Sequence, residues 1–149
     1  MARFEFVALE CVEQQEFGAD EIIVEIGGAQ AFPEVGQHMK FRSGTVLVNE
    51  ASTASMDELR PLLRAKGAVR VPDYDGVDAF VERFIPAMGL VIRVVELDFP
   101  VSRNDEIGKV LVSAVPSGRV ITKDLTGSGA HYKLHYRVVP DSEGSTPDA

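Results

Sequence analysis

Apolar and polar side chains alternate over short stretches along most of this chain, and turn residues separate the stretches. Such alternation predicts β-strands, because successive side chains of a strand point to opposite faces of a sheet. We expect strands at 3–12, 22–26, 39–41, 45–49, 110–115, 119–123 and 130–139, and another that begins at residue 91. Residues 29–36 contain proline and glycine and are expected to form a loop. Many short strands separated by turns favour an antiparallel β-sandwich.

Residues 51–88 interrupt this rhythm with a helical pattern. Ser55 and Glu58 match a capping box, in which the two side chains bind the first amides of a helix. Apolar residues follow at helical spacing: Leu59, Leu62 and Leu63. Pro61 limits this helix because proline removes a backbone hydrogen bond. A second apolar stripe predicts another helix that ends at Pro86, with Val77, Phe80, Val81 and Phe84 as its members. The insertion either covers an open end or edge of the sheets or forms a partner surface.

An acidic segment lies between two apolar runs within residues 91–112, a pattern typical of strand, loop, strand. Glu96 and Asp98 are two residues apart in the first strand, so both carboxylates leave it on the same side. Asp105 follows at the far end of the loop, just before the next strand. Three hard oxygen donors without a neighbouring lysine favour Ca²⁺ over a soft metal. An ordinary solvated loop rim is the alternative interpretation.

This acidic segment resembles the third calcium-binding loop of C2 domains, the β-sandwich modules that bind phospholipid membranes or proteins. The matching residues are Val95-Glu96-Leu97-Asp98 followed by Asn104-Asp105-Glu106-Ile107-Gly108. A second match lies at residues 19–24, where Asp20 stands in the run that closes the first loop of the family. The chain departs from the family at four points, one of which is that the Pro and Tyr of the first-loop run are missing at residues 19–24. Glu96 replaces the first aspartate of the third loop, that loop is one residue longer, and no aspartate occurs at 13–16 in the first loop.

The resemblance implies a C2-like β-sandwich that acts as a non-catalytic binding module. It implies a weak calcium site at one end of the sandwich, with Asp20, Glu96, Asp98 and Asp105 as the ligands. It also implies apical apolar residues like those that family members insert into bilayers, here Phe17, Phe99 and Val101. Packing of these three side chains under their own loops is the alternative. We expect a protein partner rather than an anionic membrane, since a protein partner can use the same tips without the electrostatic penalty.

Length and composition fit a single domain at residues 1–139, followed by a polar tail at 140–149 that we expect to be disordered. The net charge is −8. That charge disfavours nucleic acid, which requires a basic stripe, and anionic lipid, unless bound cations neutralise the acidic edge. The first residues lack the apolar core of a signal peptide, and no apolar run is long enough to span a bilayer. We therefore expect a cytoplasmic protein.

No pattern in the sequence indicates an enzyme or a small-molecule substrate. Cys11 is the single cysteine, which excludes an internal disulfide, and it is expected to pack as a small hydrophobe. His131 and His135 are expected on the surface, about 13 Å apart along one strand and too far apart to share one ion. Phosphate-loop, dinucleotide and nucleophile-elbow patterns are missing from the sequence. The alternative function is a metal-independent protein-interaction or assembly protein, for instance an accessory or immunity-type protein.

Overall fold

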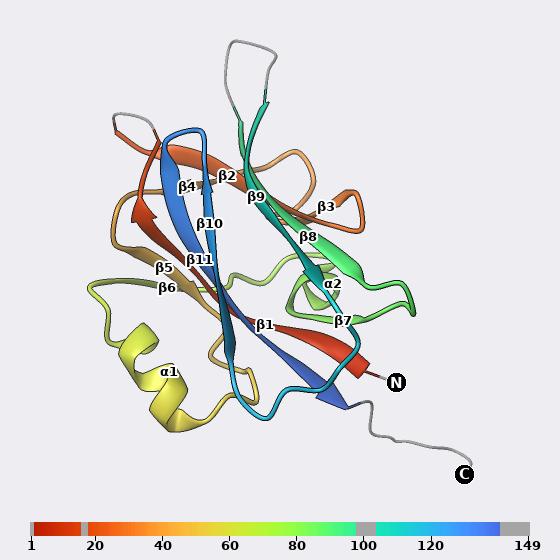
Figure 1. The fold of residues 1–149 in the computed structure, drawn as a ribbon. Helices are drawn as coiled ribbons and strands as arrows, with labels where there is room; N and C mark the ends of the chain where they lie inside the picture. Colours follow the sequence, from red (N-terminus) through yellow and green to blue (C-terminus); the bar gives the residue numbers. More distant parts are fainter. Residues whose placement is uncertain (1, 16–17, 98–103, 141–149) are drawn as a thin grey trace.

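The computed structural model describes residues 2–15, 18–97 and 104–140 and shows two β-sheets packed face to face (Figure 1). The first sheet, sheet A, has the spatial order β10 (Ile121–Gly127), β11 (Ala130–Pro140), β1 (Ala2–Glu13), β5 (Thr45–Val48) and β6 (Gly67–Arg70), with β7 (Glu82–Phe84) also paired to β1. The second, sheet B, has the order β3 (Ala29–Phe32), β2 (Asp20–Ile26), β8 (Leu90–Leu97) and β9 (Asn104–Val112), with β4 (Met39–Phe41) also paired to β2. The predicted fold, a mainly β antiparallel sandwich with a short helical insertion, is confirmed.

Strand β1 is buried on both faces along most of its length. Phe4 and Phe6 point into the core between the sheets, whereas Val7 and Ala8 belong to a second apolar cluster on the outer side of sheet A. A β-bulge between Phe6 and Ala8 shifts the pairing with β11 by one residue. Before the bulge the even-numbered residues of β1 point into the core between the sheets. After the bulge the odd-numbered residues do so, beginning with Leu9. The mixed apolar pattern of this strand thus reflects two separate cores.

Helix α1 (Met56–Leu63) covers the outer cluster of sheet A beside β5 and β6 (Figure 1). The predicted capping box is present, with Ser55 as the cap and Glu58 as its partner, and Leu59 is the buried contact of the helix. The Glu58 carboxylate also accepts a 2.7 Å hydrogen bond from the Val120 N–H. This bond, ahead of those from Ser55, lowers the pKa of Glu58. One carboxylate thus joins the start of α1 to the segment before β10.

Helix α2 (Val77–Val81) is shorter than the apolar stripe predicted. The backbone becomes extended at Glu82 and forms β7, which pairs with residues 3–5 of β1. The edge of β1 offers backbone hydrogen bonds there, and these override the helical spacing that ran on to Phe84. Two further strands were not expected: β3 occupies part of the predicted loop at 29–36, and β6 runs parallel to β5.

The single buried residue of α2, Phe80, lies in the core between the two sheets. Its ring centroid is 4.3 Å from that of Phe6 in β1 and 4.8 Å from that of Phe32 in β3. Phe80 therefore fills the space where one edge of the sandwich would otherwise open. In the described ranges, no helix is long and apolar enough to cross a membrane.

Replacement of Phe80 by alanine tests this role, because it leaves a cavity between the sheets. We expect Phe80→Ala to lower the free energy of unfolding by about 3–5 kcal/mol in chemical denaturation. The matched control is Phe84→Ala in the same insertion, where the side chain is 47% exposed and the loss should be about 1 kcal/mol or less. Equal losses for the two variants would show that Phe80 has no special place in the core.

Candidate functional site

Strand register brings three of the four predicted metal-ligand residues to one corner of sheet B, the acidic corner, formed by Asp20, Glu96 and Asp105. Glu96 pairs directly with Asp105 across β8 and β9, and with Ile22 across β8 and β2. Directly paired residues place their side chains on the same face, and Asp20 is two residues before Ile22, so all three carboxylates share one face. Asp105 was expected in the loop but lies in β9, because pairing with β8 extends to Asn104.

Asp20 and Glu96 are both fully buried, at 0% exposure. Burial of a carboxylate is costly unless hydrogen bonds replace its water, and Asp20 receives several. The backbone N–H of Gln15 donates to both carboxylate oxygens of Asp20 at 2.9 Å, and the Tyr132 hydroxyl donates to Oδ2 at 2.7 Å. The backbone N–H of Glu21 is 3.5 Å from Oε2 of Glu96. Hydrogen bonds within the fold therefore hold the Asp20 carboxylate in place.

Gln15 joins two of these carboxylates. Its side-chain amide donates to Oδ2 of Asp105 at 2.9 Å, while its backbone amide binds Asp20. The link joins the segment after β1 to strand β9. Sequence reasoning missed this glutamine, because the partner of its side chain is 90 positions away in the chain.

Tyr132 is the second residue that sequence reasoning did not include in the site. It lies on the inner face of β11 in sheet A, and its bond to Asp20 joins the two sheets next to the acidic corner. A signal was present, since a tyrosine on the apolar face of a strand needs a partner for its hydroxyl. Burial, reinforced by the bond to Asp20, raises the pKa of Tyr132, so the hydroxyl stays protonated and remains a donor.

Cys11, His131 and His135 each have a defined structural environment. Burial raises the pKa of Cys11 to about 11, so the thiol is not a nucleophile at neutral pH. His131 binds Asp124 at 2.8 Å, whereas His135 contacts Thr122 and Glu10, so the two rings have separate partners. Both histidines lie on the outer face of β11, as expected, but the side chain of His135 is only 12% exposed. Burial lowers the pKa of His135 against the opposing effect of Glu10.

The remaining predicted site residues, Asp98 and the apolar tips Phe17, Phe99 and Val101, lie outside the described residues. Within the part of the chain that the structure describes, no group of three or more histidine, cysteine, aspartate or glutamate side chains is arranged to hold a metal ion. The acidic corner thus gathers carboxylates from three strands without a complete metal cage among the residues described.

Comparison with protein-family models and with curated proteins found no match to this chain. Among solved structures, the chain is similar to "Extended-Synaptotagmin 2, C2A- and C2B-domains", with a TM-score of 0.39 and 15% sequence identity. The aligned region covers 93% of this chain and 39% of that one, so the chain spans about two-fifths of its length. A similarity at this level carries no information about ligands or partners.

Removal of the Tyr132 hydroxyl tests whether this bond holds the corner to sheet A. We expect Tyr132→Phe to lower the free energy of unfolding by about 1–3 kcal/mol, because the buried Asp20 carboxylate loses a donor. Tyr136→Phe is the matched control on the same face of β11, since no hydrogen bond of its hydroxyl occurs among the described residues. That change should stay within about 0.5 kcal/mol in the same denaturant titration. If Tyr132→Phe is as stable as Tyr136→Phe, the hydrogen bond from Tyr132 to Asp20 does not stabilise the contact between the acidic corner and sheet A.

Proposed function

We propose that this chain is a non-catalytic binding module that binds Ca²⁺ weakly at the acidic corner and engages a protein partner through the adjacent loops. The observation that carries the proposal is the strand register that gathers Asp20, Glu96 and Asp105 on one face of one corner. Carboxylates in such a cluster repel one another, and a divalent cation bound to their oxygens relieves that repulsion. Asp98, two residues beyond Glu96 in the sequence, would complete the ligand set.

Weak affinity follows from the bonds that the carboxylates already make. Asp20 accepts from Gln15 and Tyr132, so part of its lone-pair capacity is used within the fold. The Gln15 amide occupies Oδ2 of Asp105 in the same way. A cation would have to displace or share these donors. We therefore place the dissociation constant for Ca²⁺ at about 10⁻⁴ to 10⁻³ M, the range of loosely organised sites.

The calcium proposal is tested by titration calorimetry, together with thermal unfolding, on the full chain. At a Kd of about 1 mM, about 10 mM Ca²⁺ should stabilise the folded state by about 1.4 kcal/mol. The double variant Asp98→Asn/Asp105→Asn should lose both the heat of binding and the stabilisation. Asp57→Asn/Asp73→Asn removes the same charge at two exposed positions outside the corner and should keep both. No heat of binding to wild type at millimolar Ca²⁺ would refute the site.

A metal-independent interaction protein is the second candidate, and the internal hydrogen bonds of Asp20 favour it. Three donor contacts from Gln15 and Tyr132 already satisfy this carboxylate in the described structure. The corner is then a rigid support for the loops that carry Phe17, Phe99 and Val101. A net charge of −8 repels anionic lipid, and one bound Ca²⁺ offsets only part of it. Each apolar tip contributes about 1.5–3 kcal/mol if fully buried, which suits weak reversible binding.

Liposome co-sedimentation and partner pull-down, each with and without Ca²⁺, separate these possibilities. We expect Phe17→Ser/Phe99→Ser to abolish partner capture while sedimentation with anionic vesicles stays low for both proteins. Val35→Ser, which removes an apolar side chain that is 76% exposed elsewhere, should leave capture unchanged. Capture that is independent of Ca²⁺ but sensitive to the double variant would favour the metal-independent form. Indifference of both assays to the double variant would exclude the loop end as the binding surface.

A further inference from the structure

The link between Tyr74 and α2 contains Asp75-Gly76, the single Asp-Gly pair in a sequence that has no Asn-Gly pair. Both residues are exposed, and Gly76 has a φ of +90° and a ψ of 5°, which fit the third position of a type II turn. The Val77 N–H donates to the Tyr74 carbonyl at 3.1 Å and closes this turn. The backbone nitrogen after Asp75 therefore belongs to the one residue type that has no side chain to shield it.

The Asp75 carboxylate is not held by the fold. An aspartate at the start of a helix commonly accepts hydrogen bonds from the first amides, but no side chain caps α2. Among the described residues, this carboxylate has no hydrogen bond or ion pair, and the Gly76 N–H has no backbone hydrogen bond. A Cβ at Gly76 would meet no atom within 4 Å, so the neighbouring space is open. The side-chain carboxyl group and the backbone nitrogen that follows it are thus both free to react with each other.

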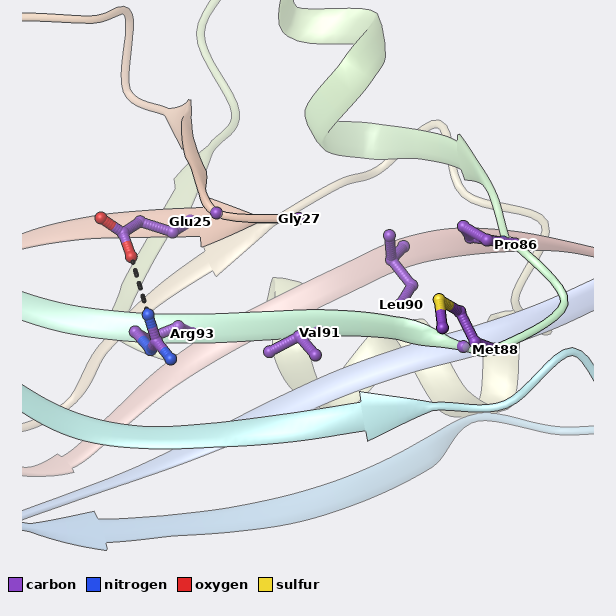
Figure 2. A pocket seen from close by; sticks show the side chains of 9 residues that line it. Glu25, Gly27, Pro86, Met88, Leu90, Val91 and Arg93 are labelled. Carbon is purple, nitrogen blue, oxygen red and sulfur yellow. Dashed lines mark hydrogen bonds and ion pairs between the residues drawn. The ribbon is translucent and has the colours of Figure 1, made fainter.

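Both ends of this link are packed against β3. Before the link, the Tyr74 hydroxyl donates to the Ala31 carbonyl, and the tyrosine ring centroid is 6.1 Å from that of Phe32. After the link, the ring centroid of Phe80 in α2 is 4.8 Å from that of the same Phe32. Helix α2 then leads through β7, which pairs with β1, to Pro86 and β8 (Figure 2). A change in the length of the link therefore acts on a segment whose two ends contact one aromatic ring.

We propose that Asp75 is a modification site at which the backbone rearranges to isoaspartate without an enzyme, and that this change releases α2 and Phe80 from the edge of the sandwich. The Gly76 nitrogen attacks the side-chain carboxyl carbon of Asp75, a C–N bond forms, and the amide proton leaves with a carboxyl hydroxyl as water. Water then opens the five-membered imide ring at the main-chain carbonyl. The chain now continues through the side chain, and the former main-chain carbonyl is a free carboxylate. One water leaves and one enters, so mass and formal charge stay the same.

Isoaspartate lengthens the backbone between Tyr74 and α2 by one carbon atom, about 1.5 Å. The turn closed by the Val77 N–H loses its geometry, because its hydrogen-bonded ring gains an atom. Helix α2 has five residues and one buried side chain, and a helix this short depends on its tertiary contacts. Tyr74 keeps its hydrogen bond to Ala31 in addition to its ring contact. We therefore expect the extra length to displace α2 rather than Tyr74 and to remove Phe80 from the core.

The modification site is distant from the acidic corner along sheet B. Asp20 begins β2, whereas β3, which holds both ends of the link, pairs with residues 24–26 at the other end of that strand. The rearrangement therefore requires neither calcium nor the loop tips, and it can be tested whatever the outcome of the calcium experiment.

The test is incubation of the full chain at neutral pH, below its unfolding temperature, followed by tryptic digestion and electron-transfer fragmentation. Cleavage after Arg70 and Arg83 gives one peptide that contains Asp73, Asp75 and Asp78, so two internal references share every step. The nitrogen after Asp78 donates a backbone hydrogen bond, and the nitrogen after Asp73 belongs to a tyrosine. We expect isoaspartate to form at Asp75 at least about tenfold faster than at either reference, a difference of about 1.4 kcal/mol in activation free energy.

The release of α2 is measured on the isoaspartate form after its separation from the unaltered protein by ion-exchange chromatography. In hydrogen-exchange mass spectrometry, amides of residues 77–84 should exchange at least about tenfold faster in this form, whereas those of β11 should keep their protection. Asp75→Glu is the matched control. It keeps the charge but would need a six-membered ring, so the incubated variant should show neither the rearrangement nor the faster exchange.

Each part of the proposal has its own contrary outcome. Equal rates of isoaspartate formation at the three aspartates would overturn the assignment of the site. Unchanged exchange of residues 77–84 in the isoaspartate form would overturn the release of α2. Loss of protection in β1 and β11 as well would also overturn it, since the whole domain would then unfold. Faster exchange in incubated Asp75→Glu would show that the loosening of α2 has another cause.

Discussion

The two-sided burial of β1 is the constraint on which most of this architecture depends. A strand with apolar side chains on both faces needs a cover on each side, because water would otherwise contact both rows. Sheet B covers the inner row, which includes Phe4 and Phe6, and α1 with its flanking residues covers the outer row around Val7. The bulge after Phe6 reconciles the two, since it lets one strand supply both cores in turn. The insertion is thus part of the domain core.

At the acidic corner, the same carboxylate serves stability and offers ligand chemistry. Asp20 accepts from Tyr132 of the opposite sheet, so it contributes to the closure of the sandwich as a buried acceptor. A residue with this structural duty is a poor choice for a high-affinity metal site, because coordination competes with bonds that the fold needs. This competition separates the two proposed functions, because hydrogen bonds that commit Asp20 to the sheets favour the metal-independent proposal over the calcium proposal.

The sequence was sufficient for features that depend on local pattern. Alternation located β1, β2, β4, β5, β8 and β11, and the capping box located the start of α1, because both signals arise from neighbouring residues. It was insufficient where a distant strand decides the conformation. Glu82 leaves the helical spacing because the edge of β1 lies beside it, and Gln15 and Tyr132 join the site through partners 90 and 112 positions away. Such contacts depend on which strands become neighbours in the fold, and the pattern of adjacent residues in the sequence does not specify this.

The shared carboxylate of Glu58 has a consequence for local opening of the molecule. A helix of eight residues is too short to persist in water without tertiary contacts. Because Glu58 caps α1 and also accepts from Val120, the helix cannot undock without releasing the segment that leads into β10. We therefore expect the two segments to open as one unit, with amides that exchange with solvent together and ahead of those of the core strands.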